Sequence, residues 1–181
     1  MDRDLVQISK FLSLVLRHKP ETIGLALDAG GWLDIAALIE GANRVGVALD
    51  AALLREMVAR NDKRRFAFSA DGKRIRAVQG HSVPVDLGLE PRVPPNLLYH
   101  GTTTRFLTSI RHQGLLPQER QFVHLSPDAE TATLVGQRHG VPVVLVIAAA
   151  AMHHDGRLFC LSENGVWLTD AVPVVYIDFP A

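Results

Sequence analysis

A proline-rich segment near the middle of the chain constrains the fold more than any other feature. Residues 83–96 carry four prolines and little hydrophobic periodicity. Proline cannot continue a helix, and it removes a hydrogen-bond donor from a strand. The segment therefore predicts a linker between an N-terminal lobe of residues 1–82 and a C-terminal lobe of residues 97–181, each long enough to bury a core of its own.

Charge is divided unevenly between the two halves. The 181-residue chain has no formal net charge, but residues 1–82 hold 13 Lys/Arg against 10 Asp/Glu, and residues 83–181 hold 6 against 9. This asymmetry favours contact of the first half with a polyanion. No apolar run reaches the roughly 18 residues of a membrane span, and acidic Asp2 and Asp4 do not fit the basic start of a secretory signal. We expect a soluble, cytoplasmic protein with no membrane partner.

The N-terminal lobe opens with a predicted amphipathic helix, because apolar residues between Leu5 and Leu16 recur at helical spacing. Pro20 cannot extend this helix, which is expected to end with Arg17 and His18 in its last turn. Cations at a helix C-terminus complement its dipole and need no further function. A guanidinium beside an imidazole also suits a phosphate dianion. The spacing alone favours the dipole.

The rest of this lobe is predicted to hold an extended run at residues 24–28, two helices and a β-hairpin. Asp34 and Asp50 are typical N-caps of helices. Two short strands flank Asp71 and Gly72, which is a strong hairpin signal. Helices followed by a hairpin predict a winged-helix arrangement, which is common among nucleic-acid-binding proteins.

Basic residues gather on this hairpin and just before it. Only Asp62 and Asp71 oppose them between residues 60 and 76. The run predicts either an ordinary solvated surface or a phosphate-facing wing. Its members are Arg60, Lys63, Arg64, Arg65, Lys73, Arg74 and Arg76.

The C-terminal lobe is predicted to alternate short strands with two helices. The first helix has Phe106 among its inward residues and Gly114 as a C-cap. Ser126 as N-cap and Pro127 at the first helical position predict the start of the second, which ends near Gly140. We therefore expect an α+β fold whose second lobe is mainly antiparallel. The strands are predicted near residues 97–100, 122–125, 141–148, 158–161, 166–168 and 172–179.

Polar side chains at the ends of these elements are candidate anion ligands. His100 ends a strand, and Gly101 after it would let a ligand approach the backbone. Ser126 stands at a helix N-terminus, where free N–H groups favour a phosphate, and Arg138 lies at the end of that helix. Each also has a structural interpretation, as a turn residue, a cap or a dipole contact. His124, inside an apolar strand, is better explained as a core histidine with a partner.

Several chemistries lack their signatures in this sequence. The chain has no phosphate loop, no dinucleotide-binding glycine motif and no nucleophile elbow. The single Cys160 excludes an internal disulfide and a cysteine metal cage. His153 and His154 are adjacent and point in different directions, with no third ligand evident. We therefore expect no metal.

Seven stretches taken in order resemble the RNA (tRNA) 2′-phosphotransferase family over nearly the entire chain. Each stretch is weak alone, but the ordered set is specific. They are SKFLS with LRHKP at 9–20, DKRRF at 62–66, IRAVQGHS at 75–82, LYHGT at 98–102, VHLS at 123–126, VGQRHG at 135–140 and ENGVWLT at 163–169.

The resemblance implies a winged-helix RNA-binding lobe followed by an NAD-binding lobe like that of ADP-ribosyltransferases. It also implies two reaction steps with NAD as co-substrate. The internal 2′-phosphate of a tRNA-like RNA, of the kind that some tRNA splicing leaves, attacks the nicotinamide ribose and expels nicotinamide. The ribose 2″-hydroxyl then attacks the phosphodiester. The products are RNA with a 2′-OH and ADP-ribose 1″,2″-cyclic phosphate.

The family's catalytic tetrad maps by resemblance onto Arg17, His18, Arg65 and Arg138. Arg17 and Arg65 would clamp the 2′-phosphate, and His18 would act as general acid and base in the second step. Arg138 would reach the same phosphate, so that all four converge. Where ADP-ribosyltransferases carry a catalytic glutamate, this chain has Val166 with a glutamate three residues before it.

The resemblance also implies binding residues for the two substrates. NAD would be held by His100, Gly101, Thr102 and Ser126. RNA would be contacted by Lys63, Arg64, Gln79, His81 and Ser82.

Two other functions remain compatible with the sequence. The same pocket could ADP-ribosylate terminal phosphates of RNA or DNA. Alternatively, the chain could be a winged-helix regulator that binds a nucleotide without turning it over. The tetrad distinguishes an enzyme from a regulator, because a regulator would not need these four residues on both lobes. No obligate protein partner is expected.

Overall fold

The chain divides into two compact units, Met1–Gly88 and Leu89–Ala181. The computed structural model describes residues 3–61 and 63–180. Asp2 and Asp62, on which two of the predictions above drew, lie outside the described residues. The division falls inside the predicted linker at residues 83–96, and each unit has its own hydrophobic core.

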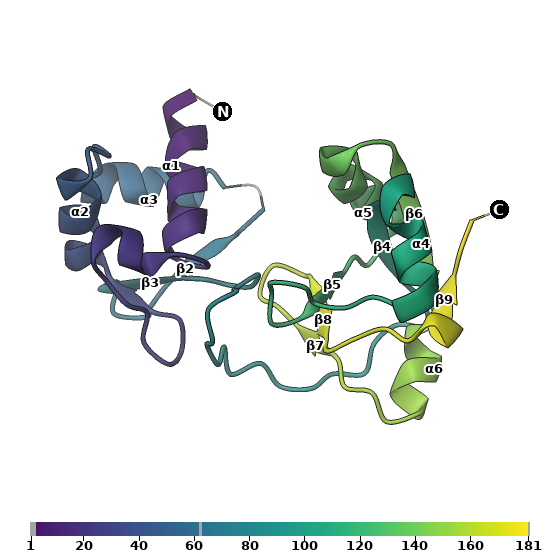
Figure 1. Cartoon of the computed structure of the whole chain (residues 1–181). Coiled ribbons are helices and arrows are strands. Elements are labelled where there is room, and N and C mark those ends of the chain that lie inside the picture. Colours follow the sequence, from purple (N-terminus) through teal and green to yellow (C-terminus); the bar gives the residue numbers. More distant parts are fainter. Residues whose placement is uncertain (1–2, 62, 181) are drawn as a thin grey trace. The chain divides into compact units, whose positions relative to one another are not determined.

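The first unit packs helices against a small antiparallel sheet (Figure 1). The strands lie in the order β1-β3-β2, and the turn between β2 and β3 holds Asp71 and Gly72, as predicted. The elements are α1 (Arg3–Val15), η1 (Pro20–Ile23), β1 (Leu33–Asp34), α2 (Ile35–Arg44), α3 (Ala51–Ala59), β2 (Phe66–Phe68) and β3 (Arg74–Ala77).

Both predicted N-caps in this unit are confirmed. The Asp34 carboxylate accepts a hydrogen bond from the Ala37 N–H at 2.9 Å, and that of Asp50 accepts from the Leu53 N–H at 2.8 Å. Each satisfies one of the donors that a helix start leaves without an intrahelical partner. The two helices therefore begin where the sequence predicts.

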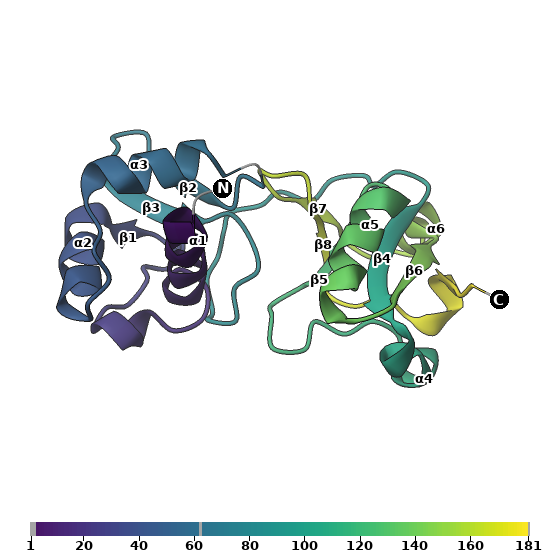
Figure 2. The ribbon, with the colours of Figure 1, turned by 90° about the horizontal axis from the view of Figure 1, so that it is seen from above.

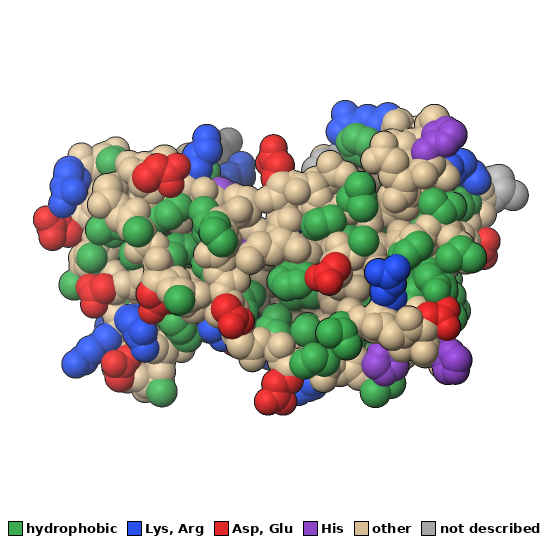
Figure 3. Space-filling model, turned by 60° about the horizontal axis from the view of Figure 1, so that its bottom comes forward, with side chains coloured by type: hydrophobic (Ala, Val, Ile, Leu, Met, Phe, Trp, Pro, Cys, Tyr) green, Lys and Arg blue, Asp and Glu red, His purple; other side chains and the backbone are tan. Residues whose placement is uncertain are grey.

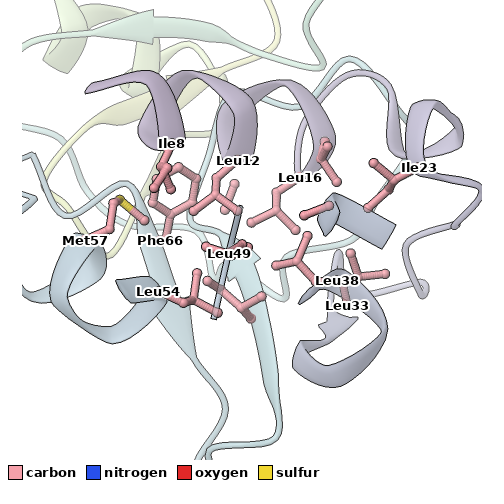
Figure 4. Close-up of a cluster of buried hydrophobic side chains, with 14 of the residues drawn as sticks. Ile8, Leu12, Leu16, Ile23, Leu33, Leu38, Leu49, Leu54, Met57 and Phe66 are labelled. Atoms are coloured by element: carbon pink, nitrogen blue, oxygen red, sulfur yellow. The ribbon is translucent and has the colours of Figure 1, made fainter. Parts of the chain in front are cut away.

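Helix α1 supplies the centre of the first core (Figure 4). Leu12 and Leu16 are fully buried against Leu38 of α2, Leu54 of α3 and Phe66 of β2. Burying such a side chain contributes about 1.5–3 kcal/mol. The apolar stripe thus fixes α1 against the sheet, and this fixes where its C-terminal end emerges.

The predicted end of the first helix is wrong by a few residues. Helix α1 ends at Val15, so Arg17 and His18 lie in the turn after it and not in its last turn. The N–H groups of His18 and Lys19 both donate to the Leu14 carbonyl, at 3.0 and 2.8 Å, which closes the helix before Pro20.

The predicted extended run at residues 24–28 forms no strand. Gly24, at φ +71°, caps helix η1 instead. The Asp28 carboxylate then accepts from the N–H groups of Gly30 and Trp32, which makes a turn. The strand that pairs with β3 follows this turn, at Leu33–Asp34.

The second unit contains two three-stranded antiparallel sheets, in the orders β4-β6-β9 and β5-β8-β7. Figure 2 shows α5 lying along β4 and β6. A bridge between Tyr99 and Ser126 joins the two sheets. The elements are β4 (Leu98–Thr103), α4 (Thr104–Gln113), β5 (Val123–Leu125), α5 (Ala129–Gly136), η2 (Gln137–His139), β6 (Pro142–Ile147), α6 (Ala149–His154), β7 (Cys160–Leu161), β8 (Trp167–Thr169), η3 (Val174–Tyr176) and β9 (Ile177–Asp178).

Gly101 lets α5 pack closely on β4. A Cβ at this position would overlap the carbonyl oxygen of Ala132 and lie 2.9 Å from the Gly136 nitrogen. The space that the missing side chain leaves is therefore filled by a helix. We predicted that it would admit a ligand, and the structure gives the glycine a packing role on this side.

The start of α5 differs from the prediction. Its N-cap is Asp128, whose carboxylate accepts from the Thr131 N–H at 2.6 Å and hydroxyl at 3.0 Å. Ser126 instead pairs with Tyr99 through its backbone. Helix α5 ends at Gly136 and continues as η2, short of the predicted Gly140.

The remaining differences concern one side chain and the last strand. Phe106, predicted to point inward, is 43% exposed. In place of one strand at residues 172–179, the structure has helix η3 followed by the short β9.

The described part of the chain is a mixed α/β structure with six α-helices and antiparallel strand pairs. None of its helices is long and apolar enough to cross a bilayer. On the face shown in Figure 3, acidic, basic and hydrophobic side chains are interspersed.

Candidate active site

The turn after α1 is held by the segment that follows β3. The carbonyl oxygen of Arg17 accepts hydrogen bonds from the N–H groups of Ser82 and Val83, at 2.9 and 3.3 Å. These bonds join parts of the chain that are far apart in the sequence. They bring two parts of the predicted site together within the first unit, namely Arg17 with His18, and Gln79 to Ser82.

Arg17 is half-buried between an aromatic ring and a glycine. Its guanidinium carbon lies 5.9 Å from the centre of the Phe66 ring. On another side is Gly80, at φ +88°, where a Cβ would lie 3.6 Å from the same carbon. Phe66 directly follows Arg65, whose carbonyl accepts from the Val78 N–H at 3.0 Å. The backbone of Arg65 therefore lies close to the segment that holds Arg17.

His18 is half-buried, with its Nδ1 atom 3.0 Å from the Ser82 hydroxyl oxygen. His81, which directly precedes Ser82 and was also predicted to contact RNA, is only 2% exposed. Burial, followed by the nearby charges of Arg17, His18 and Arg76, lowers the pKa of His81 to about 4, against an opposing contribution from the Leu16 backbone. His81 is therefore neutral at neutral pH.

The charges that act on His81 make this site positive. Arg17, His18 and Arg76 all lie near enough to disfavour a further positive charge on His81. Guanidinium groups gathered in this way attract an anion, and a phosphate can accept several of their N–H groups at once. This part of the first unit is therefore suited to bind a phosphate.

The other residues predicted to contact RNA are spread around this cluster. Lys63 and Arg64 are exposed, and Gln79 is half-buried. Arg64 has φ +42°, which is uncommon for a residue with a side chain. Its N–H donates to the Asn61 carbonyl at 2.8 Å, so this backbone forms a tight turn before Arg65.

His100 and Ser126 come together where the two sheets of the second unit meet. The Nδ1–H group of His100 donates to the carbonyl of His124 at 3.1 Å, because a carbonyl can only accept. Ser126 donates from its N–H to Tyr99 at 2.7 Å and accepts from the Tyr99 N–H at 2.9 Å. Burial lowers the pKa of His100, the His124 carbonyl opposes this, and the charge of Arg120 lowers it further.

Arg120 is a candidate residue that the sequence did not single out. Partial burial lowers the pKa of its guanidinium, and the nearby charge of Arg138 lowers it further. Arg138 is exposed in η2, and Arg120 lies in the loop before β5. Arg120 thus lies near both His100 and Arg138, and a bound anion would relieve the repulsion between the two arginines. No periodicity in the sequence brings these positions together.

The other two residues predicted to hold NAD follow His100 on β4. Gly101 packs against α5, as described above, and the Thr102 side chain is 6% exposed. His124, half-buried, donates from Nδ1 to the Phe122 carbonyl at 2.9 Å, as predicted for a histidine with a structural partner.

Metal ligands do not gather in residues 3–61 and 63–180. These residues contain no group of three or more His, Cys, Asp or Glu that could hold a metal ion. His153 donates to the Arg157 carbonyl and His154 lies beside Asp155, so the two adjacent histidines have separate partners.

Comparison with known proteins identifies the family. The model of the RNA 2′-phosphotransferase, Tpt1 / KptA family, matches residues 3–171. The chain belongs to this family. It is 60% identical over 173 residues to a probable RNA 2′-phosphotransferase of Agrobacterium fabrum, covering 96% of this chain and 93% of the relative. A probable RNA 2′-phosphotransferase of Rhodopirellula baltica is 57% identical over 180 residues, covering 99% and 98%.

RNA 2′-phosphotransferases are enzymes, and the resemblance read from the ordered motifs is therefore confirmed at the level of the family. The match spans both units, including the turn after α1 and the junction of the two sheets. Both candidate clusters thus lie within the part of the chain that is shared with these enzymes.

Proposed function

We propose that this RNA 2′-phosphotransferase moves an internal 2′-phosphate from RNA to the ADP-ribose part of NAD. The products are nicotinamide, RNA with a 2′-OH and ADP-ribose 1″,2″-cyclic phosphate. The observation that carries the proposal is the cationic cluster of the first unit, in which Arg17 and His18 are held by Ser82 and Val83. NAD supplies the acceptor ribose carbon and the nicotinamide leaving group.

The first unit is proposed to bind the phosphate that is transferred. Arg17 and Arg65 donate N–H groups to its oxygens and offset the charge that develops on them. His18 returns or removes a proton as the ribose hydroxyl attacks and the RNA oxygen leaves. The helices, the hairpin and the basic residues around it support a winged-helix role in binding tRNA-like RNA, to which Lys63, Arg64 and Gln79 would contribute.

The second unit is proposed to bind NAD as an ADP-ribosyltransferase-like lobe. The fit is supported by His100, whose half-buried ring is held by the His124 carbonyl, and by Arg120 with its neighbour Arg138. Guanidinium groups suit the negative charge of a pyrophosphate. Gly101 and Thr102 set the position of His100 on β4, and Arg138 is proposed to contact the 2′-phosphate when RNA is bound.

The test is incubation of the protein with NAD and an RNA that carries one internal 2′-phosphate. We expect equal amounts of nicotinamide and ADP-ribose cyclic phosphate, and none with the same RNA bearing a 2′-OH. Arg17→Ala and Arg138→Ala should slow the reaction by at least about a hundredfold. Arg55→Ala, at an exposed position of α3, is the matched control. Absence of nicotinamide release by the wild-type protein would overturn the proposal.

A further inference from the structure

Ser82 makes its polar contacts with the two residues of the turn after α1. Its N–H donates to the Arg17 carbonyl at 2.9 Å. Its hydroxyl oxygen lies 3.0 Å from Nδ1 of His18 and 3.5 Å from the same Arg17 carbonyl. The hydroxyl is thus set between an imidazole nitrogen, which can donate or accept, and a carbonyl oxygen, which can only accept.

This arrangement favours the Nδ1–H tautomer of His18. A hydroxyl carries a single proton, and the Arg17 carbonyl can interact with the hydroxyl only by receiving that proton. The contact is long for a hydrogen bond, but the carbonyl dipole still orients the O–H group towards it. A lone pair of the oxygen then faces Nδ1, which must carry a hydrogen to bond with it. Nε2 is then the ring nitrogen that carries no proton and can accept one.

The backbone keeps the Ser82 hydroxyl in this place. Gly80 adopts φ +88°, which residues with a Cβ rarely do, and so turns the chain towards Arg17. The side chain of His81 is buried in the first unit, which anchors residues 80–82. The N–H of Val83 adds a second bond to the Arg17 carbonyl, at 3.3 Å. Ser82 is therefore held in place by the residue before it, His81, and by the residue after it, Val83.

We propose that Ser82 is a positioning residue that holds His18 as the Nδ1–H tautomer, so that Nε2 receives and returns the proton during transfer. Ser82 acts through His18 and is not an RNA contact, the role that the sequence assigned to it. The inference rests on the proposed function, in which His18 exchanges a proton with the substrates. The same bond persists when His18 is protonated, because the Nδ1–H group still points at the Ser82 oxygen. The hydroxyl therefore need not turn during the reaction.

The tautomer can be measured without any substrate. Protein labelled with ¹⁵N at histidine gives separate ring-nitrogen shifts for Nδ1–H and Nε2–H imidazoles, and His18→Gln assigns the signals. We expect His18 to be mainly Nδ1–H in the wild type and in Ser82→Thr, which keeps the hydroxyl. Ser82→Ala should move the population towards Nε2–H, and Ser109→Ala, an exposed serine of α4, should not. A wild-type His18 that is mainly Nε2–H would overturn the inference.

Steady-state kinetics on the same variants separate positioning from RNA binding. Ser82→Ala should lower kcat on the order of tenfold to a hundredfold, because general acid–base catalysis is impaired, with little change in KM for RNA. Ser82→Thr should recover most of this loss. A rise in KM alone would identify Ser82 as an RNA contact and contradict the inference. If the wild type shows no turnover, the proposed function fails, whereas the tautomer measurement still decides the role of Ser82.

Discussion

The guanidinium carbon of Arg17 lies 5.9 Å from the centre of the Phe66 ring, which connects the turn after α1 to the first strand of the hairpin. Phe66 is 5% exposed and belongs to the core of the first unit. A cation over an aromatic face gains about 0.5–1 kcal/mol at an exposed site and more when desolvated. The placement of a candidate catalytic arginine is therefore linked to core packing.

Replacing Phe66 should disturb the reaction more than the fold. Phe66→Leu keeps an apolar side chain and should cost about 1–2 kcal/mol of unfolding free energy. Loss of the ring frees Arg17 to move, which should lower kcat/KM roughly tenfold or more. Phe159→Leu, at a fully buried phenylalanine of the second unit, is the control for stability. Equal kinetic losses in the two variants would show that the ring has no special relation to Arg17.

The buried His81 should make stability depend on pH. Its pKa is about 4 in the folded chain, against 6.5 for an unperturbed histidine. Between these values the unfolded chain binds a proton that the native chain does not, so stability falls as pH decreases from about 6.5 to about 4, by roughly 3 kcal/mol at most.

Urea unfolding of the wild type and of His81→Gln between about pH 4 and pH 7 tests this expectation. The difference between the two curves removes the contribution of the other titrating groups. As pH decreases, the unfolding free energy of the wild type should fall relative to that of His81→Gln. Only the wild type has a histidine at this position that takes up a proton on unfolding. A difference that is constant with pH would mean that His81 keeps an ordinary pKa.

Gly101 should tolerate no side chain. Gly101→Ala places a Cβ against the backbone of α5 at Ala132, which cannot move aside as a side-chain end could. We expect a loss of more than about 3 kcal/mol, as for severe overpacking. Gly46→Ala meets nothing within 4 Å and only strains φ at +84°, so it should cost about 1 kcal/mol. Thermal unfolding compares the two, and similar losses would contradict close packing of α5 on β4.

The N-cap of α5 can be tested in the same way. Asp128→Ala removes the acceptor of the Thr131 N–H and should cost about 0.5–2 kcal/mol. Ser126→Ala should cost less, because Ser126 pairs with Tyr99 through its backbone, which alanine keeps. If Ser126→Ala is the more destabilising of the two in urea unfolding, the serine contributes to the helix start after all.

Features with short-range causes were predicted from the sequence. The caps Asp34 and Asp50 and the turn at Asp71 and Gly72 depend on residues within a few positions, so their chemistry is visible locally. Where two local signals compete, the prediction failed. Ser126 and Asp128 are both good N-caps, and the pairing of Ser126 with Tyr99, distant in sequence, decides between them.

The candidate site depends on tertiary structure to a larger extent. The motifs identified Arg17 and His18, but the Ser82 contacts that hold them arise only when the segment after β3 returns to α1. Arg120 carries no motif of its own, and its nearness to Arg138 follows from the packing of the second unit. The burial of His81 likewise had no signal in a polar stretch.

The fate of the transferred phosphate tests the central claim most directly. An RNA with ³²P in a single internal 2′-phosphate is incubated with the protein and NAD, and the products are separated. The account predicts that the label leaves the RNA and is found in ADP-ribose 1″,2″-cyclic phosphate, in equal amount to the nicotinamide released. Label released as inorganic phosphate, or retained on the RNA while NAD is consumed, would contradict it.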